Sequence, residues 1–282
     1  MEQLLAEAEG RVAPAISAVV WEDGRELFAR APERVYDLAS LTKVLCTTEL
    51  ALRLDVDRGH ALLPRGVTIA MLLQHASGWP AWRPFHERAH GRDAVVAAAL
   101  AEPLVNPPGA VHTYSDVGFL ALGAVIEAEL GARIDALWEG PLRWGDPRSE
   151  PTDDGPGGPV NDGNARAMGG VAPHAGLFGT AREVAAVATR FLDHPRAREA
   201  FTRKGPGTHA LGWDTPNPDG TSSAGPRPPP DAVGHLGFTG TSVWMSPSRR
   251  RVAVLLTNRV AFGPDLTGIR ALRRAFHQGA WA

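Results

Sequence analysis

Residues 36–45 read Tyr36-Asp37-Leu38-Ala39-Ser40-Leu41-Thr42-Lys43-Val44-Leu45 and place a hydroxyl three positions before an amine. From Leu41 to Leu54 the chain is mostly apolar on every side, which predicts a buried helix with Ser40 as its N-cap. Side chains three residues apart share a helix face, so Ser40 Oγ and Lys43 Nζ should lie within hydrogen-bond reach. Burial and the positive helix end both favour a neutral amine, which can act as a base for a serine.

Lysine is rare in this chain. It holds 29 Lys and Arg residues, of which Lys43 and Lys204 are the lysines. Arginine stays protonated at any working pH, so a chain that otherwise uses arginine has a chemical reason to keep a lysine at this position. The Ser-x-x-Lys spacing is also a known catalytic signature. The alternative is a serine cap followed by an unrelated lysine.

The composition describes a folded chain without a strongly charged partner. With 282 residues, 44% of them apolar, it can bury a sizeable core in one large domain or two modest ones. A formal net charge of -2 gives no basic surface, so we expect neither nucleic acid nor a membrane as a partner. The single cysteine, Cys46, lies among apolar residues and is expected in the core.

The N-terminal residues Met1 to Glu9 are acidic and amphipathic. They lack the basic segment and the apolar run of a signal peptide. The cytoplasm is therefore the expected location, and a periplasmic or secreted protein is the alternative if a leader is removed from the natural chain.

Strand patterns occur at both chain ends, and helix patterns dominate between them. This order predicts an α+β fold, an α/β sandwich with an antiparallel sheet from both chain ends and an inserted all-helical domain. We assign residues 1–58 and 205–282 to the sheet domain, residues 59–204 to the helical domain, and the active site to their interface. Residues 144–170, rich in Gly, Pro and Asp, should form a long surface loop. The expected strands are Ala15–Trp21, Arg25–Arg30, Ser242–Met245 and Arg251–Thr257; the expected helices are Thr68–His75, Asp93–Ala101, Asp116–Leu130, Arg182–Leu192 and Asp265–His277.

Two further segments complete a set of three motifs. Thr113-Tyr114-Ser115-Asp116 opens a predicted helix, and Gly234-His235-Leu236-Gly237-Phe238-Thr239-Gly240-Thr241 leads into a predicted strand. With Ser40-x-x-Lys43, these segments resemble, in order, the Ser-x-x-Lys, Tyr-x-Asn and Lys-Thr-Gly motifs of the serine β-lactamase and penicillin-binding protein superfamily. The resemblance is to its class C-like branch of esterases and D-aminopeptidases, and it extends over Leu72–Gly78, Gly169–Phe178 and Leu255–Arg259.

The resemblance implies a β-lactamase/transpeptidase-like fold and a set of roles. Ser40 would attack a carbonyl to form an acyl-enzyme, while Lys43 and Tyr114 carry its proton to the leaving group. The backbone N–H groups of Ser40 and Phe238 would form the oxyanion hole. The resemblance places Asp116, His235 and Gly237 in the substrate-binding part of the site and implies neither a cofactor nor a metal.

Two departures from the family pattern bear on the substrate. Asp116 stands in place of asparagine, and its charge would raise the pKa of Lys43. His235 stands in place of lysine, and at an ordinary pKa near 6.5 it would lose its charge between pH 6 and 8. We therefore expect an esterase-like serine hydrolase acting on small esters or amides, ahead of a β-lactamase or D,D-peptidase. A binding or sensor protein of the same fold is the alternative from another class.

A competing motif lies at His86-Glu87-Arg88-Ala89-His90, which fits the H-E-x-x-H signature of zinc metallopeptidases. Pro84 and Gly91 leave barely more than one turn of helix around it, so zinc catalysis through His86, Glu87 and His90 is a remote alternative. His75 and His174 are expected to be structural. Asn161-Asp162 either faces the cleft or lies on the surface.

The sequence thus predicts a preference for esters over β-lactams. Hydrolysis of p-nitrophenyl butyrate is expected to show a higher kcat/KM than hydrolysis of nitrocefin, because His235 does not supply the permanent cation that binds a β-lactam carboxylate. Steady-state kinetics with both substrates measures this preference. A clearly higher kcat/KM for nitrocefin would reverse the order.

Overall fold

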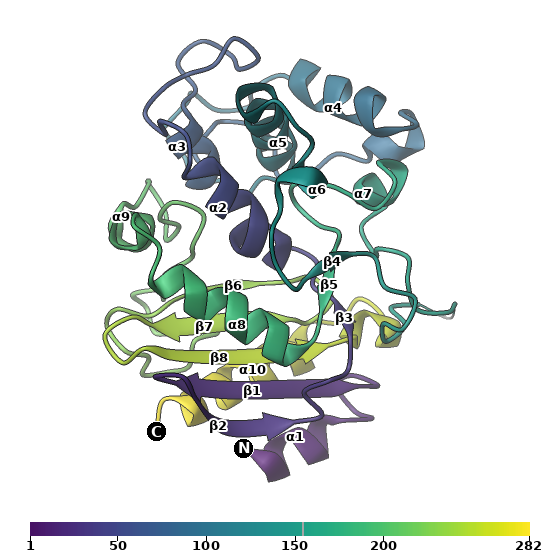
Figure 1. Cartoon of the computed structure of the whole chain (residues 1–282), viewed down its shortest axis with the longest axis vertical. Helices are drawn as coiled ribbons and strands as arrows, with labels where there is room; N and C mark the ends of the chain where they lie inside the picture. The colour runs from purple at the N-terminus through teal and green to yellow at the C-terminus, as the bar shows by residue number, and fades with distance from the viewer. Residues whose placement is uncertain (154) are drawn as a thin grey trace.

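The computed structural model describes residues 1–153 and 155–282. A five-stranded antiparallel sheet in the order β2-β1-β8-β7-β6 forms its lower half in Figure 1. β1 (Ile16–Glu22) and β2 (Arg25–Arg30) come from the N-terminal part of the chain, whereas β6 (Val233–Leu236), β7 (Ser242–Ser246) and β8 (Arg251–Thr257) come from the C-terminal part. Because β1 pairs with β8 along its whole length, the expected sheet from both chain ends is confirmed.

The central strand β8 separates two hydrophobic cores. Val252, Val254 and Leu256 are buried in the larger core, on the side of α8 (Ala181–Leu192). Ala253 and Leu255 point to the opposite face, into the smaller core beside α1 (Glu2–Ala8) and α10 (Thr267–Ala280). Successive residues of a strand face opposite sides, so a strand covered on both faces is apolar without interruption.

The helical region lies above the sheet in Figure 1 and is joined to it by a small sheet in the order β3-β5-β4. Its longest helix, α5, covers Asp116–Leu130 as predicted, from the Ser115 cap to Gly131 in the left-handed conformation. The remaining elements are α2 (Thr48–Ala51), α3 (Ile69–Leu73), α4 (Arg92–Ala101), α6 (Ile134–Leu137), α7 (Gly163–Ala167), α9 (Ala197–Thr202), β3 (Tyr36–Asp37), β4 (Arg143–Trp144) and β5 (Leu177–Gly179).

Two expectations about local structure are wrong. The predicted helix from Leu41 to Leu54 contains a π-helical turn, Lys43–Thr47, and α2 ends at Ala51. A π turn holds an extra residue per turn and often marks a functional site. Segment 144–170 is not a loop throughout, because Asp162 caps α7 within it by accepting a hydrogen bond from the Ala165 N–H. Residue 154 of that segment lies outside the described part of the chain.

Helix α8 belongs in space with the sheet. It contacts β1, β7 and β8, although its residues fall inside segment 59–204. A capping box between Thr180 and Glu183 fixes its start. The domain boundaries predicted at residues 58 and 204 stay a prediction.

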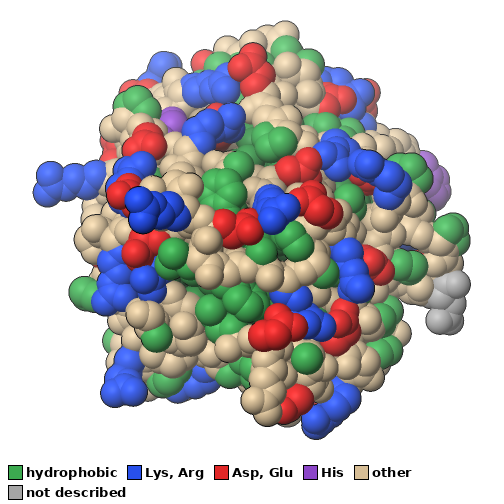
Figure 2. Space-filling model, turned by 60° about the horizontal axis from the view of Figure 1, so that its bottom comes forward, with side chains coloured by type: hydrophobic (Ala, Val, Ile, Leu, Met, Phe, Trp, Pro, Cys, Tyr) green, Lys and Arg blue, Asp and Glu red, His purple; other side chains and the backbone are tan. Residues whose placement is uncertain are grey.

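Charges of both signs are interspersed on the face shown in Figure 2. Ion pairs of Arg30 with Glu2 and Glu9 join β2 to α1 in this part of the molecule. Such neighbouring pairs cancel one another's field, so this face offers no broad region of one charge.

Stability should depend on the larger core. Leu256→Ala removes a side chain that is 0% exposed and is expected to lower the free energy of unfolding by about 2–5 kcal/mol. Leu27→Ala on β2, where the leucine is 52% exposed, is the matched control and should change it by no more than about 0.5 kcal/mol. Urea denaturation of both variants provides the comparison, and equal losses would show that β8 is not central to the core.

Candidate active site

Ser40 follows a strained turn that distant segments hold in place. Ala39 has a φ of 47°, in the left-handed region that is costly for a residue with a Cβ. Asp37 supports the turn by accepting a hydrogen bond from the Ala39 N–H at 2.8 Å. Thr239 donates to the Asp37 carbonyl at 2.8 Å and ties the turn to the segment after β6. Burial raises the pKa of the Asp37 carboxyl to about 6, although hydrogen bonds from the Asn161 and Ala39 backbone N–H groups oppose the shift.

Lys43 lies beneath Ser40 with three oxygen atoms around its amine. Nζ is 2.9 Å from Ser40 Oγ, 3.1 Å from the His174 carbonyl oxygen and 2.7 Å from Asp116 Oδ1. The side chain is 0% exposed. Burial lowers the pKa of Lys43, but the neighbouring Asp116 carboxylate and Tyr114 outweigh it, so the pKa is raised. The predicted proximity of Ser40 and Lys43 is thus present, with the amine favoured in its charged form.

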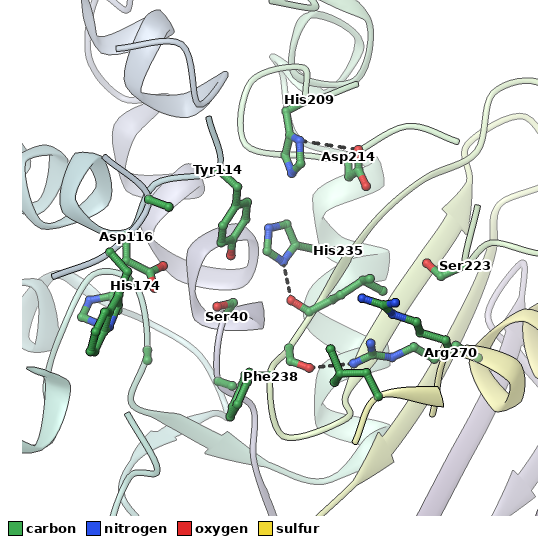
Figure 3. Close-up of a pocket in the computed structure, with 18 of the residues that line it drawn as sticks. Ser40, Tyr114, Asp116, His174, His209, Asp214, Ser223, His235, Phe238 and Arg270 are labelled. Atoms are coloured by element: carbon green, nitrogen blue, oxygen red, sulfur yellow. Dashed lines mark hydrogen bonds and ion pairs between the residues drawn. The ribbon is translucent and has the colours of Figure 1, made fainter. Parts of the chain in front are cut away.

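Tyr114 borders the same amine from the start of α5. Its ring centroid is 5.1 Å from Lys43 Nζ, and Figure 3 shows the phenol pointing toward Ser40. The next residue, Ser115, fixes the approach by capping α5, since its Oγ accepts the Gly118 N–H at 2.9 Å. Burial raises the pKa of Tyr114; the Lys43 ammonium opposes this shift and the Asp116 carboxylate adds to it. The three motif residues Ser40, Lys43 and Tyr114 therefore meet in one place.

The backbone of Ser40 and Phe238 offers two free donors. Within the described part of the chain, neither N–H group donates a hydrogen bond. Arg259 holds the Phe238 carbonyl with Nη2 at 2.7 Å, and its guanidinium lies 4.7 Å from the Phe238 ring centroid. A Cβ at Gly237 would lie 2.0 Å from Thr241 Oγ1, so this tight segment requires glycine. The role of these two N–H groups as an oxyanion hole stays a prediction.

A cavity of about 1050 Å³ opens at Ser40 and extends away from it between the helical region and the sheet. In Figure 3, Asp214 and Arg270 lie at its far side, with Ser223 between them. Aromatic side chains flank its opening, since Phe238 is 60% and Trp82 45% exposed. Its lining includes Ser40, Tyr114, Asp116, Asn161, Asp162, His174, His209, Asp214, Asn217, Ser223, His235, Gly237, Phe238 and Arg270.

Asp162, just before α7, contacts His174, which in turn contacts Lys43. Asp162 Oδ1 is 2.9 Å from His174 Nε2, and the His174 carbonyl accepts the hydrogen bond from Lys43. Burial raises the pKa of Asp162, but His174 and Lys43 outweigh it and lower the pKa well below its usual range. Both Asn161 and Asp162 line the cavity, which is one of the two positions that the sequence left open.

Three buried imidazoles lie beside Tyr114. The ring nitrogens of His75, His209 and His235 come within 4.8 Å of one another, the one such group of potential metal ligands in the part of the chain that the structure describes. Burial lowers the pKa of all three, with a further contribution from Lys43; that of His209 falls to about 3. At neutral pH these rings carry no charge. The expectation that His235 titrates between pH 6 and 8 is therefore wrong.

The hydrogen bonds of these rings argue against a metal. His235 Nδ1 donates to the Leu236 carbonyl at 2.9 Å, so its Nε2 has a free lone pair, as in a metal ligand. His75 Nδ1 instead accepts the Ser115 backbone N–H at 3.0 Å. A neutral His75 must then carry its proton on Nε2, which excludes that nitrogen as a ligand. Within the described residues, the Nε2 atoms of His75 and His235 are both buried and have no hydrogen-bond partner.

The His86-Glu87-x-x-His90 motif does not form a zinc site. The helical turn there covers Phe85–Glu87 and ends before His90, so the two histidines do not share a helix face. His86 Nδ1 instead lies 3.1 Å from Asn164 Oδ1, at the start of α7. The zinc alternative loses the geometry on which it depended.

Sequence reasoning missed His209, Asp214 and Arg270. None belongs to a recognisable motif, and all three come from segments distant from residue 40. His209 Nδ1 is 3.0 Å from His112 Nε2 and 3.5 Å from Asp214 Oδ1. The sole sequence signal was a group of polar residues near the third motif, which is common in loops.

The sequence of this chain is similar to those of known proteins. The family model described as Beta-lactamase matches residues 1–139 and 135–278. The chain is 29% identical over 318 residues to an N-acetylmuramyl-L-alanine amidase of Bacillus subtilis, covering 84% of this chain and 71% of the amidase. It is 27% identical over 242 residues to a proposed D-alanyl-D-alanine carboxypeptidase of Salmonella agona, covering 67% of this chain and 56% of that relative. The chain belongs to the β-lactamase family.

Solved structures agree on the fold. A β-lactamase of Mycobacterium bovis superimposes with a TM-score of 0.70 at 22% identity, covering 98% of this chain and 97% of that chain. The β-lactamase/transpeptidase-like fold expected from the three motifs is confirmed. Since these relatives are named as hydrolases, the expected enzyme class, a hydrolase, is confirmed as well. Among the described helices, none is both long and apolar enough to cross a membrane.

The uncharged state of His235 predicts a pH-independent preference. For a pair of esters that differ by one carboxylate, the ratio of kcat/KM values should stay constant from pH 6 to 8, because burial keeps the His235 pKa well below 6.5. Steady-state kinetics across that range tests this. A ratio that falls as pH rises would show that His235 is protonated near neutral pH.

Proposed function

We propose that this chain is a serine hydrolase that cleaves ester or amide bonds of small molecules through an acyl-enzyme on Ser40. The observation that carries the proposal is the 2.9 Å contact between Ser40 Oγ and the fully buried Lys43 amine, with the Tyr114 phenol beside it. A hydroxyl becomes a useful nucleophile when groups that can move its proton lie within hydrogen-bond reach.

The reaction follows from the positions of these groups. Ser40 Oγ attacks the substrate carbonyl while its proton passes to the Lys43 and Tyr114 pair. The developing oxyanion accepts hydrogen bonds from the Ser40 and Phe238 N–H groups, and loss of one such donor typically costs about 3 kcal/mol of transition-state stabilisation. Tyr114 then donates a proton to the leaving group, and water releases the acyl group by the reverse sequence.

The neutral imidazoles favour a substrate that is uncharged near Ser40. His235 stands where the family motif has a lysine, and it brings no cation to the cavity at neutral pH. The exposed aromatic rings of Trp82 and Phe238 at the cavity suit an apolar acyl or leaving group. The Bacillus relative is named an amidase, so an amide is as fitting a substrate as an ester.

Arg270 favours a second candidate, a β-lactamase or D,D-peptidase. Its side chain lines the cavity, and no ion pair with another described residue occupies it. A guanidinium in such a position can bind a substrate carboxylate. The name of the Salmonella relative, a carboxypeptidase, agrees with this reading.

Labelling with a fluorophosphonate tests the nucleophile without knowledge of the substrate. The wild type is expected to gain one adduct, because Lys43 and Tyr114 activate Ser40, and Ser40→Ala is expected to gain none. Intact-mass spectrometry measures both.

Ser223→Ala is the matched control, since Ser223 lines the same cavity but accepts a hydrogen bond from Trp244 Nε1 at 3.2 Å. This variant should be labelled like the wild type. An adduct that persists in Ser40→Ala would place the nucleophile elsewhere. No adduct in any variant at any pH would favour a binding or sensor protein of the same fold.

A further inference from the structure

Asp116 brings a full negative charge into contact with the Lys43 amine. Its Oδ1 lies 2.7 Å from Nζ, and its side chain is 19% exposed while that of Lys43 is 0% exposed. Asp116 is also the first residue of α5, where the positive end of the helix dipole favours a carboxylate. An asparagine, which the family motif has here, would place an uncharged amide beside the amine. The ion pair is therefore a departure from the family motif.

The other groups around Lys43 do not cancel this charge. The His174 carbonyl accepts from Nζ but carries no net charge, and Asp162 is paired with the His174 ring. Burial keeps the nearby imidazoles neutral. The titratable or charged groups that face Lys43 from the neighbouring elements are thus Tyr114 and Asp116 at α5, His75 after α3, Asp162 and His174 around α7, His209, and His235 on β6.

We propose that Asp116 holds Lys43 as an ammonium, leaves Tyr114 as the group that takes the Ser40 proton, and so moves the working range of the site toward alkaline solution. This inference rests on the proposed function. Tyr114 first loses its proton to water at the cavity. The Ser40 Oγ–H proton then moves to the phenolate oxygen as the Oγ–C bond forms and the carbonyl electron pair moves to the oxyanion. When the bond to the leaving group breaks, the phenol returns that proton to it.

The charge of Asp116 acts in the same direction on both proton carriers. It raises the pKa of Lys43 and that of Tyr114, whereas burial has opposite effects on the two. Loss of the charge must therefore lower the pKa of whichever group removes the Ser40 proton. The sign of the expected shift does not depend on which of the two acts as the base.

The rate of fluorophosphonate labelling against pH tests this inference. Fluoride leaves without needing a proton, so the rate reports removal of the Ser40 proton alone. Between pH 6 and 10, the midpoint of the rise for Asp116→Asn is expected about one unit or more below that of the wild type. Each pH unit by which the midpoint falls corresponds to about tenfold faster labelling at pH 7.

Two variants serve as controls. Asp116→Glu keeps the charge and should keep a midpoint near that of the wild type. Asp214→Asn removes a carboxylate from the same cavity that has no contact with Lys43, so its midpoint should not move. A midpoint for Asp116→Asn that is unchanged or higher, with Ser40 labelled, overturns this inference but leaves the proposed function standing. No labelling of Ser40 in any variant at any pH overturns both.

A second measurement asks which group takes the proton. Tyr114→Phe should slow labelling of the otherwise wild-type protein by about a hundredfold or more. In the Asp116→Asn background, Tyr114→Phe should slow labelling by a factor about ten times smaller. Lys43 is then able to lose its proton and to take the place of Tyr114 as the base. Equal losses in the two backgrounds would show that Asp116 does not decide which group is the base.

Discussion

A buried ammonium beside a serine is the constraint around which the site is arranged. An unpaired charge in a protein interior costs several kcal/mol. The Lys43 ammonium can therefore be fully buried only if oxygen atoms surround it. These oxygens come from three separate parts of the chain: the turn at Ser40, the start of α5 at Asp116, and the His174 backbone 131 residues away. The charge therefore joins the helical region to the segment that carries Ser40. Removing any one segment would leave the ammonium with one oxygen neighbour fewer.

The sheet supplies the other half of the site. Thr239 and Thr241, which follow β6, donate hydrogen bonds to the carbonyls of Asp37 and Leu38, just before Ser40. The same segment carries Phe238. The two backbone N–H groups proposed as the oxyanion hole thus belong to segments about 200 residues apart, which contact each other directly. A preorganised pair of this kind needs no reorganisation when charge develops.

The sequence predicted those parts that depend on local signals. Helix α5 matches its predicted limits because Ser115 caps one end and Gly131 adopts the left-handed conformation at the other. The meeting of Ser40, Lys43 and Tyr114 followed from motif order. The π turn at Lys43–Thr47 was missed because an apolar run has no signal for an extra residue per turn. β3, β4 and β5 are two or three residues long and too short for an alternating pattern.

The remaining errors have tertiary causes. Burial, which a sequence does not reveal for an isolated histidine, moved the titration of His235 out of the neutral range. His209 and Asp214 enter the cavity from a segment with no periodic pattern, and their meeting with His112 depends on long-range packing. The H-E-x-x-H motif was a remote alternative already in the sequence, because Pro84 and Gly91 confine the helical turn between them.

The position of β8 at the centre of the sheet has a consequence for biosynthesis. The ribosome makes the β1–β2 hairpin and the Ser40 turn first, but β1 has no second neighbour until residues 251–257 emerge. Contacts this distant in sequence form slowly. Until then the apolar edge of β1 is open to strands of other nascent chains, and Ser40 lacks the segment that carries Phe238. The same topology that leaves the emerging chain prone to misassociation also keeps the two sides of the cavity apart until β8 has been made.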